Sequence, residues 1–346
     1  MIQLFKTSFH SSFLHFVGNK NNDEGVIFSA NPFSPSQSTR NNLLNYFLRP
    51  FLENEEYYQL YHDTSLDLNE VYTYVTIIFS NKEQLYEQSI NLAKHLYNQS
   101  FHPKIKGGEF YIVYFKDCVL NGETLDAIGL FKSENKDIFL KVYQQNGGFN
   151  LESEKGINIK KLDKGCLILN KDRENGYVVA LVDNTNKGLE AQYWIDDFLH
   201  VHPRQDEYSN TKNFLSLVKT FITNELPREF DISKADQINL LNKSLDFFKA
   251  NEILDIIDFT NSVITQPEII DKFRQSKKKY EISNDLVIDN KFSISETAIK
   301  KQQRSYKRVI QLDQKIKIII DGNRDKIIQG EDAKGKYYKV YYIEEK

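Results

Sequence analysis

The residue types and spacing that best fit a chemical role are five cations near the end of the 346-residue chain: Lys300, Lys301, Arg304, Lys307 and Arg308. In a helix, at 100° per residue, these side chains fall within an arc of about 120°. The apolar residues Ile299, Tyr306 and Val309 fall on the opposite side, so a helix near 295–310 would pack one face on the protein and expose a cationic stripe. Such a stripe is typical of phosphate-binding surfaces. A solvated helix face is the alternative interpretation.

Further cations follow the stripe along the chain. Lys315 and Lys317 are two residues apart in a predicted strand, 315–320, and therefore point to the same side. Arg324 lies in the turn that follows. With the five helical cations, these three residues complete the set that we predict to contact phosphates.

The histidines and cysteines give weaker evidence for a chemical role than these cations do. His200 and His202, near Asp196 and Asp197, have a spacing that would let two imidazoles share a metal on a strand. Pro203 follows at once and no third ligand is identifiable, so we predict no metal site. Cys118 and Cys166 lack metal or redox spacing and are interpreted as buried structural thiols.

Catalytic signatures are missing from the sequence. It contains no phosphate-binding loop, nucleophile elbow, zinc-protease motif or dinucleotide fingerprint. We therefore predict no catalytic residue and no cofactor, and expect the protein not to be an enzyme. A metal-dependent phosphodiesterase acting on nucleic acid is kept as an alternative, because acidic residues are common along the chain.

The charge is unevenly distributed along the chain. Residues 272–326 contain 15 lysines and arginines but 7 acidic residues, and residues 327–346 contain four of each. Since the whole chain has a net charge of −3, the first 271 residues carry −11. An acidic body with a basic segment near its end indicates a polyanionic partner for that segment.

The elements that would position these residues favour an α+β protein with two domains. The length exceeds what a single core usually organises. In the first domain, 1–205, we expect a strand-rich start, helices near 43–48 and 85–97, a strand at 71–79, and a closing helix at 191–199. Between them, short apolar runs predict an antiparallel meander of about five strands, at 111–115, 127–131, 138–143, 166–169 and 177–182. The segment 202–206 is the predicted domain boundary.

In the second domain, 206–346, apolar residues recur at helical spacing. The predicted helices lie at 214–222, 238–248, 252–259, 267–280 and 295–310. Strands are expected at 286–288, 315–320 and 336–343. The fold prediction is thus an antiparallel sheet with flanking helices, then a helical segment, then a small α+β part that ends in a β-hairpin.

The compartment is predicted from the same composition. Two cysteines in so long a chain form no disulfide framework, and no apolar stretch approaches the ~20 residues of a membrane span. Lys6, His10 and His15 interrupt the apolar start, so no signal peptide is expected. We predict a cytoplasmic protein without a membrane partner, and the sequence predicts no oligomeric state.

Several segments resemble the YejK/NdpA-like family of bacterial nucleoid-associated proteins, with the greatest similarity to its Bacteroidetes-type members. The similar stretches are 108–117, 126–134, 161–170, 190–194, 295–313, 315–324 and 336–342, and the resemblance spans the chain from about residue 5 to its end. The resemblance implies association with the nucleoid and brings no catalytic residues with it.

Three hypotheses follow from the sequence. The first is a nucleoid-associated protein that binds DNA largely without sequence specificity, through the C-terminal cations. The second is an adaptor that docks on a DNA-processing enzyme through its acidic N-terminal domain. The third is the phosphodiesterase.

Overall fold

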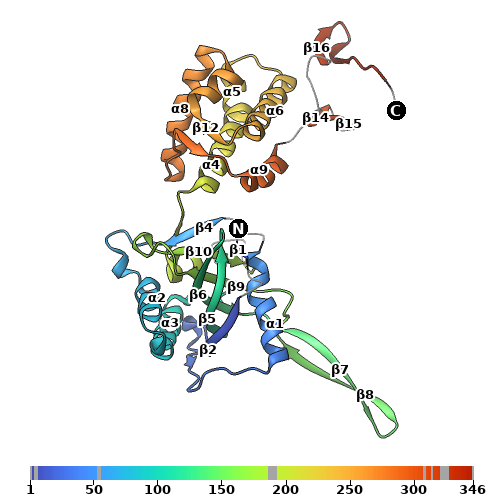
Figure 1. Ribbon diagram of the computed structural model, residues 1–346. Coiled ribbons are helices and arrows are strands. Elements are labelled where there is room, and N and C mark those ends of the chain that lie inside the picture. The colour runs from blue at the N-terminus through green and yellow to red at the C-terminus, as the bar shows by residue number, and fades with distance from the viewer. Residues whose placement is uncertain are drawn as a thin grey trace. The chain divides into compact units, whose positions relative to one another are not determined.

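The architecture described below is that of a computed structural model. It describes residues 2–3, 7–52, 56–185, 193–306, 309–312, 315–319 and 327–344. These residues divide into two compact units, Met1–Arg204 and Gln205–Lys346. The first is dominated by an antiparallel sheet and the second by helices (Figure 1). The predicted α+β class is confirmed.

The first unit begins with three strands, which are followed by helices α1, α2 and α3 and by one short strand between α1 and α2. They are β1 (Ile2–Gln3), β2 (Ser8–Val17), β3 (Val26–Ile27), α1 (Gln37–Leu48), β4 (Tyr57–Leu60), α2 (Glu70–Ser80) and α3 (Leu85–Gln99). The rest are β5 (Gly108–Leu120), β6 (Glu123–Ser133), β7 (Asp137–Gln145), β8 (Gly148–Gly156), β9 (Lys164–Leu169), β10 (Val178–Asp183), a π-helical segment (Tyr193–Leu199) and β11 (Val201–Pro203).

The main sheet is antiparallel, with the strand order β11-β4-β10-β9-β6-β5-β2-β3 and β1 paired to β5. Strand β5 is buried on both faces, which explains its continuous apolar run. Phe110, Ile112 and Tyr114 enter one core, while Val113 and Phe115 enter the other. Successive side chains of a strand point to opposite faces, so helices must cover both sides of the sheet.

Helix α1 covers one face, and α2 and α3 cover the other (Figure 1). On the α1 side, the ring of Phe47 stacks on Phe131 with centroids 4.2 Å apart. On the other side, Val75 of α2 and Leu92 of α3 are fully buried in the second core. The predicted helices at 43–48 and 85–97 are therefore confirmed.

The predicted strand at 71–79 is wrong, since these residues form α2. Val71, Tyr72, Val75 and Ile78 are buried at helical spacing, a pattern that the β-branched and aromatic composition concealed. Asn69 caps the helix by accepting a hydrogen bond from the Tyr72 N–H at 2.8 Å. A helix cap and the packing of one face decided between helix and strand.

The predicted meander needs one correction. Strands β5, β6, β9 and β10 are adjacent in the sheet, as expected, but the predicted strand at 138–143 belongs to β7, which pairs with β8 in a separate two-stranded hairpin. The turn Asn146-Gly147 joins them with positive φ at both residues, as a tight hairpin turn requires. The expected closing helix is observed over Tyr193–Leu199, and residues 191–192 lie outside the described residues.

The second unit contains α4 (Glu207–Thr220), a π-helical turn (Phe221–Glu225), α5 (Leu226–Glu229), α6 (Lys234–Ala250), β12 (Ile253–Asp255), α7 (Ile256–Phe259), a second π-helical turn (Thr260–Ile264) and α8 (Pro267–Asn284). After these come β13 (Lys291–Ser293), α9 (Glu296–Gln302), a 3-10 turn (Gln303–Ser305), β14 (Val309–Leu312), β15 (Ile316–Ile319), β16 (Ile327–Asp332) and β17 (Gly335–Val340).

Phe214 of α4 is at the centre of this helical core. Its ring contacts those of Phe248, Phe259, Phe273 and Phe292, with centroid distances from 5.0 to 6.1 Å. Aromatic pairs at such distances add to the energy of burial. The core therefore joins α4, α6, α7, α8 and β13 around one side chain.

Three further predictions in this unit need correction. The helix expected over 252–259 contains strand β12 at Ile253–Asp255, and α7 begins only at Ile256. Residues 286–288 form no regular element, and the neighbouring strand is β13, which pairs with β12. The helix expected over 295–310 ends much earlier: α9 stops at Gln302, a 3-10 turn follows, and β14 begins at Val309. Ile310 is buried against Ala235 and Ile238 of α6, and this packing favours the strand.

We predict that limited digestion with a protease of broad specificity cuts first near residues 205–206. Residues 201–203 are paired to β4 and should be protected, whereas residues 204–206 form no regular element and join the two compact units. Mass spectrometry and circular dichroism of the fragments should identify a strand-rich first piece and a helical second piece. Initial cleavage inside the main-sheet strands, at 108–133 or 164–183, would contradict independent packing of the units.

We also predict a pH dependence that originates at His15. Burial lowers the pKa of His15 to about 4, from the ordinary value of 6.5. The Ser29 N–H donates to His15 Nδ1 at 3.1 Å, so Nε2 carries the proton and donates to Ser89 Oγ at 2.9 Å. Between pH 6.5 and pH 4 the unfolded chain binds a proton that the folded chain does not, so stability falls as the pH falls.

The loss attributable to this group is about 3 kcal/mol over that window. Urea unfolding of wild type and His15→Gln at several pH values should show a shallower decline in the variant, because glutamine does not titrate. Carboxylates titrate equally in both proteins and cancel in the comparison. Identical slopes would exclude His15 as the cause.

Candidate nucleic-acid interface

The predicted cationic site lies on α9, the 3-10 turn after it, and β15. Helix α9 begins at Ser295, whose hydroxyl oxygen accepts a hydrogen bond from the Ala298 N–H at 3.3 Å. Its inner face is fixed by Ala298 and Ile299, which are buried. The Ser295 N–H also donates to Thr211 Oγ1 on α4 at 3.0 Å. These contacts hold α9 against α4.

Tyr306 anchors the end of this segment. Its side chain is buried, and its hydroxyl donates to the Leu215 carbonyl oxygen at 2.6 Å. Burial raises the pKa of the Tyr306 phenol, which therefore stays protonated and keeps donating. Together with Ile299, this side chain fixes which way the intervening cations face.

Three of the predicted helical cations are exposed on this segment. Lys300 lies 3.6 Å from Glu296, four residues earlier on the same helix. Lys301 Nζ lies 5.2 Å from the centre of the Tyr208 ring, a contact that leaves its charge uncompensated. Arg304 is exposed on the 3-10 turn. The pairing of Lys300 with Glu296 halves the net charge expected from the first two positions of that face.

Lys307, Arg308 and Arg324 belong to the predicted set but lie outside the described residues. The prediction that all five cations lie on one face of a continuous helix is nevertheless wrong, because α9 ends at Gln302 and a strand begins at Val309. The arc calculated for one uninterrupted helix therefore does not apply to all five cations.

Lys315 and Lys317 are exposed at the start of β15. Ile318, between Lys317 and Ile319, is partly buried against the cluster formed with Ala235 and Ile238 of α6. Since side chains alternate along a strand, Lys317 points away from α6 and toward solvent. Arg304, Lys301, Lys315 and Lys317 make no ion pair with any carboxylate in the part of the chain that the structure describes.

The residues that sequence reasoning missed are partners of these cations. Tyr208 and Glu296 determine how two of the lysines present their charge. Glu296 could have been found from its spacing of four residues from Lys300, which is typical of ion pairs on a helix. Tyr208 is 93 positions earlier than Lys301, and only the packing of α9 on α4 brings them together.

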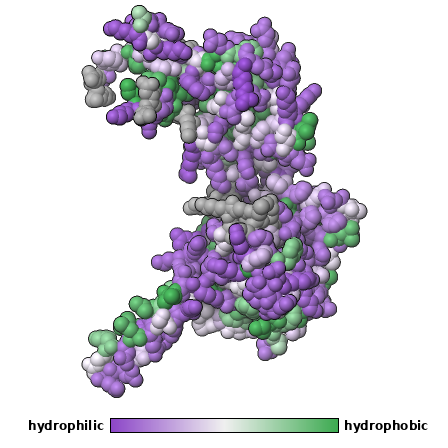
Figure 2. All heavy atoms as spheres, turned by 180° about the vertical axis from the view of Figure 1, so that it is seen from behind, coloured by the Kyte–Doolittle hydropathy of each residue, from purple (hydrophilic) through white to green (hydrophobic). Residues whose placement is uncertain are grey.

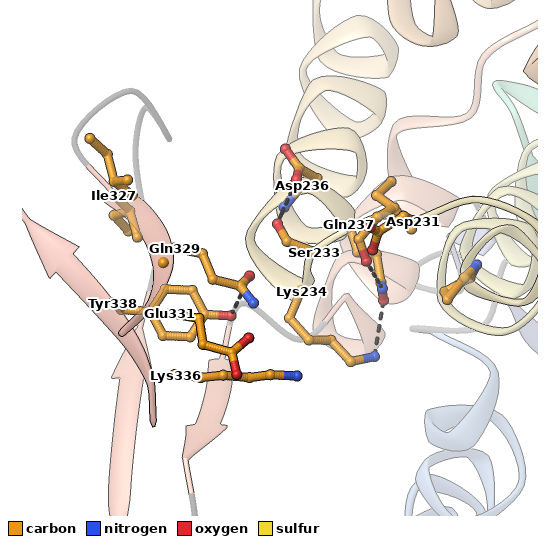
Figure 3. A pocket seen from close by; sticks show the side chains of 14 residues that line it. Asp231, Ser233, Lys234, Asp236, Gln237, Ile327, Gln329, Glu331, Lys336 and Tyr338 are labelled. Atoms are coloured by element: carbon orange, nitrogen blue, oxygen red, sulfur yellow. Dashed lines mark hydrogen bonds between the residues drawn. The ribbon is translucent and has the colours of Figure 1, made fainter. Parts of the chain in front are cut away.

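A pocket of about 920 Å³ lies elsewhere in the second unit, between the start of α6 and the β16–β17 hairpin (Figure 3). Its walls alternate in charge, with Asp231, Asp236 and Glu331 against Lys234 and Lys336. Ser233 caps α6 and bonds to Asp236, and Lys234 donates to Gln237 at 3.0 Å. Such a mixed lining does not favour a polyanion, and its polar groups are largely engaged with one another.

Two buried lysines in the first unit form the other notable cluster. Lys132 and Lys164 are cross-strand neighbours on β6 and β9, and both side chains are fully buried. Lys132 pairs with Glu134 at 3.2 Å, Lys164 pairs with Asp183 at 2.7 Å, and both ammonium groups lie near the ring of Tyr193. Burial lowers the pKa of Lys132. Enclosure keeps substrates away, so the cluster is interpreted as structural.

The residues weighed as metal ligands do not assemble a site. His202 stacks on Tyr61 at a centroid distance of 4.0 Å, and His200 has a left-handed backbone with φ of 50°. Among the residues that the structure describes, no group of three or more potential ligands could hold a metal ion. Both cysteines are buried as free thiols, and burial raises the pKa of Cys118 to about 11.

The chain thus combines an antiparallel-sheet unit with a helical unit that carries a basic C-terminal segment. The family model described as nucleoid-associated protein YejK matches residues 14–337 of the 346, and the chain belongs to that family. The family predicted from the resemblance is therefore confirmed. A search of curated proteins found no match. None of the helices within the described ranges is both long and apolar enough to cross a membrane.

We predict that Tyr306→Phe destabilises the second unit by about 1–2 kcal/mol, because the buried Leu215 carbonyl loses its hydrogen-bond donor. Urea unfolding measures this. The matched control is Tyr342→Phe, which removes a hydroxyl from a side chain that is 69% exposed and should have little effect. Equal stability of the two variants would mean that Tyr306 does not hold this segment in place.

Proposed function

We propose that this protein binds DNA directly, largely without sequence specificity, through the cations that follow residue 295. The observation that carries the proposal is the charge distribution. The segment 272–326 contains 15 cationic and 7 acidic residues in a chain whose net charge is −3. Cations that neutralise phosphates release condensed counterions from DNA, and this provides most of the affinity of non-specific binding.

The exposed cations of the predicted set that have no carboxylate partner in the described ranges form the proposed contact surface: Lys301, Arg304, Lys315 and Lys317. We include Lys307, Arg308 and Arg324 in the contact surface on the evidence of the sequence alone. Lys300 contributes less to DNA binding, because the Glu296 carboxylate neutralises its charge until a phosphate takes the place of that carboxylate. A surface ion pair of this kind is worth at most about 1 kcal/mol, so the displacement is cheap.

The geometry supports contacts to phosphates over contacts to base edges. Helix α9 has seven residues and lies flat on α4, with Ala298 and Ile299 buried beneath it. It does not project as a recognition helix does when it enters the major groove. Exposed lysines act as point charges that position a protein on the DNA backbone and carry no sequence information.

We predict that Lys301→Glu with Arg304→Glu weakens binding to all DNA sequences alike. If two phosphate contacts are lost, the slope of log K against log salt should flatten by about two units. The measurement is fluorescence anisotropy with labelled duplexes over a salt series. Thermal stability should hardly change, because exposed charges contribute little to folding.

The matched control is Lys160→Glu with Lys161→Glu, which makes the same change of charge at exposed residues of the first unit. It should leave the salt slope unchanged. Equal salt slopes in the two double variants would show that α9 is not part of the DNA-contact surface. No binding by the wild type even at low salt would favour the adaptor, in which the acidic N-terminal domain is the interacting part.

A further inference from the structure

The β7–β8 hairpin forms an arm that extends from the sheet of the first unit (Figure 1). The register pairs Ile138 with Lys155, Leu140 with Ser153, Val142 with Leu151, and Gln144 with Phe149. Directly opposite residues share a face of the ribbon. One face of the arm, here called the arm's apolar face, therefore consists of Ile138, Leu140, Val142, Phe149 and Leu151, with Gln144, Ser153 and Lys155.

The five apolar side chains of this face are among the most exposed in the protein. Their exposed fractions are 67% for Ile138, 70% for Leu140, 60% for Val142, 78% for Phe149 and 68% for Leu151. Figure 2 shows the apolar residues gathered along the arm. Apolar and polar residues thus alternate along the arm as they do in a strand that packs one face on a core. No element in the described part of the chain covers the arm's apolar face.

The opposite face of the arm is mostly polar, although it also carries Phe139, which is 44% exposed. Lys141 lies 3.3 Å from Glu154, and the Tyr143 hydroxyl donates to Glu152 at 2.7 Å. Asn150 donates to Gln145 across the tip. The arm thus has one face suited to water and one suited to burial. A lone two-stranded ribbon is marginally stable in water, so covering the apolar face would stabilise the arm itself.

We propose that the arm's apolar face docks on the same face of a second copy of this chain, with the two arms antiparallel. The five side chains expose roughly 500 Å² of apolar surface. That is at the upper end of what a monomer leaves uncovered. With the polar atoms covered alongside, it approaches the ~800 Å² per partner of a stable interface. The proposal is independent of DNA binding.

Charge selects the antiparallel orientation. Lys155, opposite Ile138 at the base, is the one charged residue of the face. Parallel arms would bring the two Lys155 ammonium groups together. Antiparallel arms separate them by about 20 Å, the length of six residues of strand, which is beyond the screening length in physiological salt. The symmetry is that of a twofold dimer, in which one patch meets its copy.

Charge also disfavours a polyanionic occupant. Residues 137–156 contain three acidic residues and two lysines. A ribbon with this balance does not attract nucleic acid or an acidic lipid surface, which both require clustered cations. A second copy needs only the flat, self-complementary apolar face.

The test is sedimentation equilibrium of the full chain, wild type against Leu151→Glu and Asn150→Glu. The two positions are adjacent and point to opposite faces, so the same charge is added to the apolar face in one variant and to the polar face in the other. We expect a dimer for wild type and Asn150→Glu. Leu151→Glu should raise the dimer dissociation constant at least about tenfold, since a carboxylate would be buried without a partner.

Circular dichroism should show the same secondary structure in all three proteins, because Leu151 is remote from both cores of the first unit. A monomeric wild type at about 100 µM would overturn the proposal, since an interface of this size is stable well below that concentration. So would an unchanged dimer in Leu151→Glu. Loss of DNA or lipid-vesicle binding in Leu151→Glu, without a change in association, would assign the face to another partner and also overturn it.

Discussion

The double-sided burial of β5 is the constraint on which the first unit depends. Its residues Phe110–Phe115 alternate between two cores, so neither face of the sheet can be left to water. Helix α1 must cover one side, and α2 and α3 the other, because each unburied aromatic side chain would forfeit on the order of 2 kcal/mol. The aromatic residues of α1 and the aliphatic residues of α2 and α3 are placed for this purpose.

The β7–β8 arm is the exception that this constraint reveals. It is inserted between β6 and β9, which are paired neighbours in the sheet, and so it leaves the layered structure without disturbing the sheet. Strands β5 and β9 bury all their apolar side chains, whereas the arm presents Leu140, Phe149 and Leu151 to solvent. A feature that violates the rule obeyed by its surroundings is best explained by a function outside the monomer.

The second unit follows a different logic. Its core is organised around the ring of Phe214, and its basic region is a thin layer laid on that core. Ile299, Tyr306 and Ile310 are buried anchors of this region. The buried anchors fix the region in place, while Lys300, Lys301 and Arg304 stay exposed. This arrangement suits a surface that must meet an extended chain of phosphates and needs no deep cavity.

The sequence by itself determined the α+β class, the family and the location of the basic segment, since composition, periodicity and charge are properties of the chain alone. It predicted the helices at α1 and α3 and most of the sheet strands for the same reason. The tertiary structure decided the rest. Val71–Phe79 is a helix because Asn69 caps it and one face packs, and β14 replaces the end of the basic helix because Ile310 is buried on α6. The pairing of Lys301 with Tyr208 and the exposure of the arm likewise depend on contacts between residues distant in sequence, which local patterns do not encode.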